Sequence, residues 1–301
     1  MDDLFRAIAV GTVSGLVTRV LLLRADYRQY PTYPHAYLSH LSMGVVAAFV
    51  GSVALPALRE GEFTAVTFLV LVATQFREVR NMEREKLAHL DQMALVPRGP
   101  HYVEGIAEVF ESRNYLVMLV ALVASGVSLW QDWRVGLGAG LVMAVIMRII
   151  KRGRRLGDMV EVELARPRFE EAGLFVGPVF IMNVGLPEAQ QEIEKWGVGI
   201  VLKGKTSQAR DILNNVGQRQ AVLHDLTAVL GNRKDVGVPE FTPLARIDHA
   251  QGLMGMFLVP QESRPEVVET VLRRVPVLEN AGLSAIPEMH EKAGRRKHES
   301  R

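Results

Sequence analysis

The chain has 301 residues, of which 49% are hydrophobic, and a formal net charge of +2. This small charge argues against the strongly basic class of nucleic-acid-binding proteins, so we expect no nucleic-acid partner. Because the sequence contains no cysteine, it excludes disulfides, thiolate metal sites and cysteine nucleophiles. The mean hydropathy of +0.13 is high for one soluble domain. Most of the excess lies before Lys151, which indicates an apolar first part and an ordinary second part.

The first part contains five hydrophobic segments that approach the roughly 20 residues needed to span a bilayer. They lie at residues 4–23, 37–58, 63–76, 115–130 and 135–150. The first segment carries Arg6 and Arg19 near its ends, where long side chains can reach the headgroups. The third is shorter and could be a tilted span, a re-entrant piece or a buried helix. Residues 1–155 are therefore predicted to form an α-helical polytopic membrane domain in contact with membrane lipid.

Lysine and arginine fall on alternate connections between these segments, as the positive-inside bias requires. The basic residues that carry this pattern are Arg24, Arg28, Arg77, Arg80, Arg84, Lys86, Arg98, Lys151, Arg152, Arg154 and Arg155. The pattern predicts a protein of the cell membrane with its N-terminus outside. The loop 77–114 and the second part of the chain are then expected inside.

After the basic stretch 151–155, strand-like and helix-like pieces alternate. Strands are predicted at residues 175–183, 198–203 and 253–259, and helices at 187–196, 208–230 and 265–274. The helix 208–230 is expected in one piece or in two with a break at Gly217, and residues 231–251 as a loop-rich stretch. Alternating elements favour a small α/β cytosolic domain over residues 156–286. The basic tail 287–301 is expected to be disordered, with attraction to anionic lipid as a further option.

The run from Gly199 to Thr206 fits the letters of a phosphate-binding loop, G-x4-G-K-[ST]. Such a loop follows a strand, whereas here the strand-like residues Ile200, Val201 and Leu202 occupy the supposed loop itself. We therefore expect a strand, a turn and a helix, and we predict no cofactor. A nucleotide-binding domain stays the alternative, and it predicts ATP affinity that disappears on Lys205→Ala.

The predicted inside loop carries two charged helical faces of opposite sign. Arg77, Arg80 and Arg84 share one face, and Glu104, Glu108 and Glu111 share another at i, i+4 and i+7. The run 96–100, Val-Pro-Arg-Gly-Pro, breaks the helix between them and allows the two faces to meet. One interpretation is a polar site in which carboxylates do acid–base chemistry or the arginines and Glu111 bind a partner. The other is a pair of exposed helix ends with weak ion pairs.

Two further polar features are candidates for function. His40 begins the second hydrophobic segment and could shuttle protons. No second histidine follows it at helical spacing, so no metal site is predicted. The amide-rich run 214–220 offers Asn214, Asn215, Gln218 and Arg219 as a recognition surface, although a helix break at Gly217 explains the same residues.

Residues 101–107, His-Tyr-Val-Glu-Gly-Ile-Ala, resemble the signature of the YIEGIA family of endospore-forming Firmicutes, with valine in place of the first isoleucine. Other strings also look like landmarks of that family, so the resemblance covers most of the chain. They are residues 62–68, 76–84, 96–99, 214–220 and 241–246.

The resemblance implies a multipass protein of the developing or dormant spore, expected in the spore inner membrane and associated with sporulation or germination. It further implies a regulatory role in the turnover or quality control of other membrane proteins, in one version as a protease. In that version Glu83, Glu104, Glu108 and His40 are the candidates for activating water. The alternative is a non-catalytic membrane scaffold or sensor whose α/β domain recruits a partner. The oligomeric state is left open.

Overall fold

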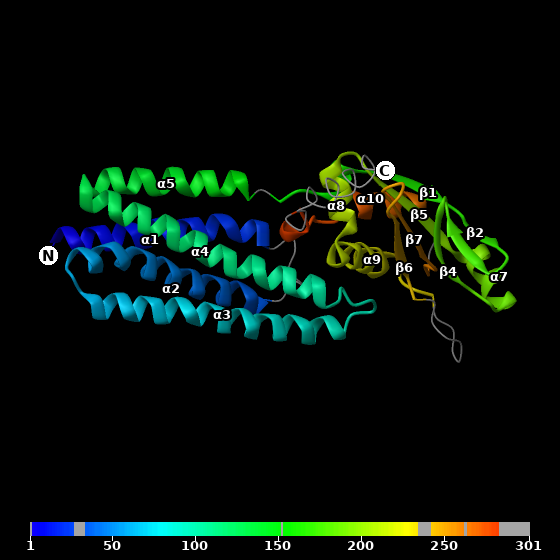
Figure 1. Ribbon diagram of the computed structural model, residues 1–301, viewed down its shortest axis with the longest axis horizontal. Helices are drawn as coiled ribbons and strands as arrows, with labels where there is room; N and C mark the ends of the chain where they lie inside the picture. The colour runs from blue at the N-terminus through cyan, green and yellow to red at the C-terminus, as the bar shows by residue number, and fades with distance from the viewer. Residues whose placement is uncertain (1, 27–33, 152, 234–241, 262–263, 283–301) are drawn as a thin grey trace, which may run out of the picture. The chain divides into compact units, whose positions relative to one another are not determined.

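The computed structural model describes residues 2–26, 34–151, 153–233, 242–261 and 264–282 (Figure 1). The predicted tail 287–301 lies outside these described residues. The chain forms two compact units, each described here by itself. The helical unit comprises residues 1–89 and 106–153, and the mixed unit comprises residues 90–105 and 154–301.

Five long helices make up the first part of the chain (Figure 1). They are α1 (Asp2–Asp26), α2 (Pro34–Arg59), α3 (Phe63–Gln92), α4 (Pro100–Trp130) and α5 (Trp133–Ile150). The predicted segment 63–76 is the first half of α3, which continues without interruption through the charged residues that follow. The predicted segment 115–130 is likewise the second half of α4.

Four of the described helices are long and apolar enough to cross a membrane. These candidate spans are Asp3–Leu23, Tyr37–Arg59, Pro100–Trp130 and Trp133–Ile150. Helix α3 is not among them, because its second half is rich in charged residues. The chain therefore has an apolar helical N-terminal region, and the third of its hydrophobic segments belongs to a helix of mixed character.

Small residues let the apolar helices approach each other closely, as in packed membrane helices. A Cβ added to Gly51 of α2 would lie 2.2 Å from the carbonyl oxygen of Met118 on α4. A Cβ on Gly15 of α1 would lie 2.7 Å from the Cβ of Ala48. Around these contacts a small core of α2, α3 and α4 side chains is fully buried, namely Ala47, Ala48, Phe76, Val117 and Ala121.

The mixed unit contains two antiparallel sheets (Figure 1). The four-stranded sheet has the order β1-β5-β7-β6, with β1 (Val160–Ala165), β5 (Val198–Gly204), β6 (Leu244–Asp248) and β7 (Leu253–Leu258). The three-stranded sheet consists of β2 (Pro167–Glu170), β3 (Gly173–Val176) and β4 (Val179–Asn183). The helices of this unit are α6 (Leu156–Met159), α7 (Pro187–Trp196), α8 (Ser207–Asn214), α9 (Val216–Leu230) and α10 (Pro265–Arg274), with a 3-10 turn at Glu279–Gly282.

The two sheets pack through an aliphatic core. Val176 and Val179 of the three-stranded sheet bury their side chains with Val201 and Phe257 of the four-stranded sheet. A Cβ on Gly199 would lie 2.8 Å from a methyl group of Val176, so the sheets are close at that strand. This arrangement is mainly hydrophobic burial, the largest favourable contribution to folding.

Several predicted elements of this unit differ from the structure. The single strand expected at 175–183 is a hairpin, because Gly177 adopts a positive φ of 57° and turns the chain between β3 and β4. Strands β1, β2 and β6 were not predicted, and the observed sheets are antiparallel throughout. The break in the long helix lies at Asn215, whereas Gly217 belongs to α9.

The residues that fit the phosphate-binding-loop pattern mainly belong to a strand. Gly199 to Gly204 are part of β5, and α8 begins only after Thr206, whose hydroxyl accepts a hydrogen bond from the Ala209 amide. The expected strand, turn and helix are therefore confirmed.

Candidate functional site

A histidine and a glutamate meet inside the helical unit. His40 lies in the second turn of α2 and Glu83 in the second half of α3. The His40 Nε2 and the Glu83 Oε1 are 3.8 Å apart, and the two side chains are only 4% and 3% exposed. Two of the residues proposed from sequence as water-activating candidates thus lie side by side in a shielded place.

An arginine from a third helix borders this pair. The Nε of Arg19 on α1 donates a hydrogen bond of 3.0 Å to the carbonyl oxygen of His40. The Arg19 guanidinium lies 5.7 Å from the ring centre of Phe110 on α4, and the His40 imidazole lies 4.7 Å from the same ring. Phe110 therefore forms a shared apolar wall for the arginine and the histidine.

The sequence of α2 makes room for this arginine. Gly44 follows His40 by one helical turn, and a Cβ at this position would lie 2.4 Å from the Cγ of Arg19. The stem of Arg19 thus occupies the space that any other residue would fill. Its side chain is completely buried, so the expectation that Arg19 reaches the headgroups is wrong. The close approach of α1 and α2 at Gly44 holds it inside the bundle instead.

Two more buried polar residues were missed in the sequence. Arg113 and Asn114 on α4 are 0% and 1% exposed. They follow Phe110 by about one turn, on the face of α4 that packs inside the helical unit. The sequence shows only a charged residue and an amide at the start of an apolar run. The same pattern is equally typical of the end of a membrane span.

Burying ionisable side chains such as those of His40, Glu83 and Arg19 costs free energy. An ionised side chain transferred to an apolar interior loses its hydration and is retained only with compensating partners. Glutamate and histidine are residue types that act as general acids and bases in catalysis. The His40–Glu83 pair is therefore suited to acid–base chemistry.

The remaining charges of the predicted loop are arranged differently. Arg80 on α3 donates a 3.0 Å hydrogen bond from Nη1 to the Oε2 of Glu111 on α4. The hydroxyl of Tyr115 donates to the other oxygen of the same carboxylate at 3.1 Å. Arg77 and Arg84 are exposed on α3, and Glu108 is exposed on α4. The basic and acidic faces thus meet at the Arg80–Glu111 ion pair, while Glu108 lies outside the buried pair.

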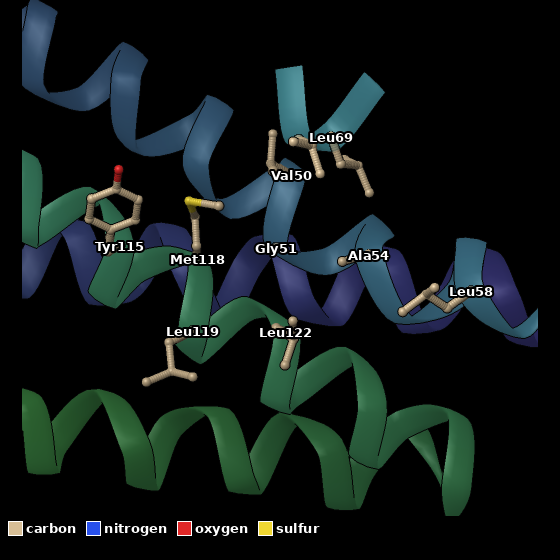
Figure 2. Close-up of a pocket in the computed structure, with 10 residues that line it drawn as sticks. Val50, Gly51, Ala54, Leu58, Leu69, Tyr115, Met118, Leu119 and Leu122 are labelled. Carbon is tan, nitrogen blue, oxygen red and sulfur yellow. The ribbon is translucent and has the colours of Figure 1, made fainter. Parts of the chain in front are cut away.

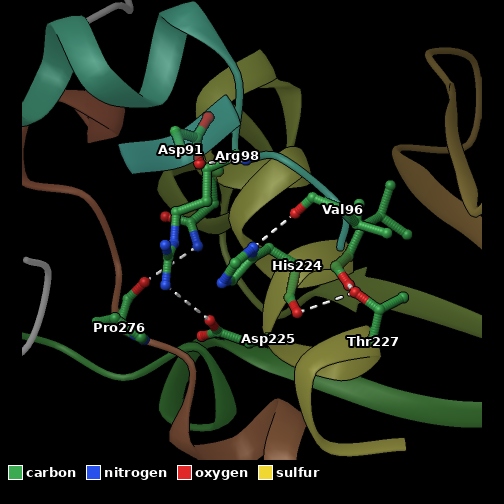
Figure 3. A network of polar contacts seen from close by, with 9 residues as sticks. Asp91, Val96, Arg98, His224, Asp225, Thr227 and Pro276 are labelled. Carbon is green, nitrogen blue, oxygen red and sulfur yellow. Dashed lines mark hydrogen bonds and ion pairs between the residues drawn. The ribbon is translucent and has the colours of Figure 1, made fainter. Parts of the chain in front are cut away.

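The turn between α3 and α4 belongs to the mixed unit, where it is fixed by its own hydrogen bonds (Figure 3). The Asp91 carboxylate accepts from the backbone amides of Arg98 at 2.8 Å and Gly99 at 2.7 Å. The Nδ1 of His224 on α9 lies 2.6 Å from the carbonyl oxygen of Val96. Because a carbonyl only accepts, this nitrogen carries the proton.

Charged groups of α9 complete the contact (Figure 3). The Arg98 guanidinium lies 3.7 Å from the Asp225 carboxylate and 5.4 Å from the ring centre of Tyr102. Burial raises the pKa of the Asp225 carboxyl above its ordinary range, while Arg98 and then His224 act in the opposite direction. The string 96–99 and the start of the string 101–107, two of those that carry the family resemblance, therefore lie against α9 within the mixed unit.

The amide-rich run forms the start of α9. The Asn215 side chain caps the helix by accepting from the Gln218 amide at 3.0 Å. The Gln218 side chain is buried and bonds both the Pro276 carbonyl, at 3.1 Å, and the Leu278 amide, at 2.8 Å. Arg219 is half-buried, and burial lowers the pKa of its guanidinium. Only Asn214 is exposed within this set.

Gly217 has a packing role in the same place. A Cβ on this residue would lie 3.0 Å from the backbone nitrogen of Tyr102, so α9 and the start of α4 approach closely within the mixed unit. Glu104 is half-buried in that unit. Among the described residues no group of three or more His, Asp or Glu side chains is placed to hold a metal ion.

Comparisons with known proteins identify one family and one similar protein. The family model described as "YIEGIA protein" matches residues 7–286. A protein of Bacillus subtilis (strain 168), named uncharacterized protein YphB, is 43% identical over 282 residues, which cover 93% of this chain and 95% of the relative. No solved structure matches the chain.

Proposed function

Because this chain belongs to the YIEGIA family, we propose that it regulates other membrane proteins in spore-forming bacteria, during sporulation or germination, by acid–base peptidase chemistry at His40 and Glu83. The proposal is carried by one observation, the buried contact of 3.8 Å between these two side chains. Ionisable residues inside an apolar helix bundle are costly and commonly mark functional sites.

The pair has the groups that peptide hydrolysis needs. Glu83 as carboxylate takes one proton from a water molecule, and the remaining hydroxide adds to the carbonyl carbon of the substrate. The His40 imidazolium then gives its proton to the departing amine as the C–N bond breaks. Transfer of the proton from Glu83 to His40 restores the starting state. Arg19 acts as a positioning residue, because its hydrogen bond to the His40 carbonyl fixes that turn of α2.

The proposed setting is the spore inner membrane, with the N-terminus outside and the mixed unit inside. Four apolar helices of sufficient length support a membrane location. The alternate distribution of lysine and arginine supports the orientation. This orientation needs an odd number of crossings, so the proposal includes the first half of α3 as a fifth span. In this setting the proposed substrates are the membrane segments of neighbouring proteins, and the mixed unit acts as a sensor or recruiting module.

A non-catalytic scaffold is the second candidate, and one observation favours it. The His40 and Glu83 side chains are almost completely shielded, whereas hydrolysis needs water at the carboxylate. In a scaffold the pair would fix the helices to each other, and the mixed unit would recruit the partner.

The experiment is to express the full chain with Glu83→Gln or His40→Gln in a spore-forming host lacking its own copy. Glu85→Gln is the matched control, because Glu85 is an exposed carboxylate two residues further along α3. Spore membrane proteins are then quantified together with the abundance of each variant. The peptidase proposal expects client proteins to accumulate in the first two strains and not in the control, after the result is corrected for the abundance of each variant.

The opposite outcome separates the two candidates. If the Glu83→Gln and His40→Gln strains match the unaltered strain, the peptidase proposal is wrong. A scaffold then predicts loss of function only when residues 175–274 are deleted, with the helical part still present in the membrane.

A further inference from the structure

An apolar groove crosses the outer side of three helices in the helical unit (Figure 2). It has a volume of about 370 Å³, and almost all of its exposed lining is apolar. Helix α2 contributes Val50, Gly51, Ala54 and Leu58, helix α3 contributes Leu69 and Val70, and helix α4 contributes Tyr115, Met118, Leu119 and Leu122. None of these residues belongs to the His40–Glu83 pair, so the groove is a separate feature.

One end of the groove is polar. Tyr115 lines the groove and donates its hydroxyl proton to Glu111, which in turn accepts from Arg80. Arg77 and Arg80 both act electrostatically on Tyr115. Arg77 is exposed on α3, and it lies seven residues after Val70, on the same helical face. The groove is thus apolar along its length and has two cations at the Tyr115 end, one of them paired with Glu111.

We propose that this groove binds one acyl chain of an anionic phospholipid, with the lipid phosphate at Arg77 and Arg80. Arg80 and the Tyr115 hydroxyl already compensate the negative charge of Glu111. The positive charge of Arg77 is therefore available to attract an anion. Tyrosine and arginine are the residues that anchor a helix at headgroup level. The hydrocarbon chain would extend from there along Met118 and Leu122.

The dimensions suit a single lipid chain. Tyr115 and Leu122 are seven residues apart on α4, so the groove extends for about 10 Å along the helix. This length lies within the roughly 15 Å that one leaflet contributes to a hydrocarbon core of about 30 Å.

The test measures phosphatidylglycerol that stays with the purified full-length chain. The protein is reconstituted in nanodiscs of phosphatidylglycerol and phosphatidylcholine, released into mild detergent, and analysed by native mass spectrometry. Ala54→Phe fills the groove, and Arg77→Gln removes the exposed cation without touching buried residues. Val142→Phe and Arg148→Gln are the controls, because both positions are exposed on α5 and neither lines the groove.

The proposal expects one retained phosphatidylglycerol per chain in the unaltered protein and in both controls. It expects complete loss of that lipid in Ala54→Phe and a preference for phosphatidylglycerol over phosphatidylcholine that disappears in Arg77→Gln. Equal retention in Ala54→Phe and Val142→Phe would overturn it. Equal retention of both lipids by the unaltered protein, or a peptide in place of lipid, would overturn it too.

Discussion

The His40–Glu83 contact predicts a strong energetic coupling between two residues that are 43 positions apart in the sequence. With His40 protonated, two unit charges 3.8 Å apart attract by about 4 kcal/mol at an effective dielectric constant of about 20. Removing one partner of a buried pair also leaves the other charge buried without a counter-charge. Such changes typically lower the stability of a protein by about 3–5 kcal/mol. We therefore expect Glu83→Gln and His40→Gln each to lower the free energy of unfolding by about 3 kcal/mol.

The double variant distinguishes a coupled pair from two independent residues. When one partner has been replaced, the other is a buried charge without its counter-charge, and replacing it as well removes that cost. The double variant should therefore be about as stable as either single variant. The coupling energy is then about 3 kcal/mol, measured by equilibrium unfolding in mixed micelles followed by circular dichroism. Distant, independent sites add to within about 0.5 kcal/mol. Additive effects at this level would refute the ion pair.

Three further outcomes follow from the contacts described above. Gly44→Ala places a Cβ at 2.4 Å from the stem of Arg19, so it should cost about 1–3 kcal/mol through overpacking and lower the thermal midpoint of the protein. Asp91→Asn weakens two charge-assisted bonds to backbone amides, and faster hydrogen exchange of the α3–α4 turn should report a loss of about 1–3 kcal/mol. Burial raises the pKa of the Asp225 carboxyl in the folded protein above its unfolded value of 3.8. The folded state therefore has its full stability from this group below pH 3.8, and it loses this contribution as the pH rises through the folded pKa. Asp225→Asn should remove this fall from a pH series of unfolding free energies.

Elements with a strong local signal could be predicted from the sequence. Helices α7 and α10 begin with a proline in their first turn and have the bounds expected for them. The apolar helices α1, α2 and α5 were visible as long hydrophobic segments. In contrast, β1 alternates valine with exposed glutamate, and β6 has five residues in a loop-rich stretch. Such short edge strands are defined by their partners, which the local sequence does not name.

The candidate site could be predicted only in part, for a related reason. His40 and Glu83 were both candidates, yet nothing in the sequence brings α2 and α3 into the register that places them 3.8 Å apart. Arg19 and Arg113 were not predicted as buried, because an arginine near the end of an apolar run usually extends to the headgroups. Whether it does so depends on the neighbouring helix, here on the space at Gly44.

The shielding of the pair decides what each proposed function requires of the molecule. A scaffold needs His40 and Glu83 to stay in contact, since the attraction between them then fixes α2 to α3. A peptidase needs water at the Glu83 carboxylate, which is 3% exposed, and therefore a movement that opens the helical unit. Arg19 holds the turn of His40 from α1, whereas Glu83 approaches from a helix that is not among the four apolar ones. Displacement of α3 alone would separate the carboxylate from the imidazole and admit water between them, so under the peptidase proposal α3 is the mobile element and the α1–α2 pair is the fixed one.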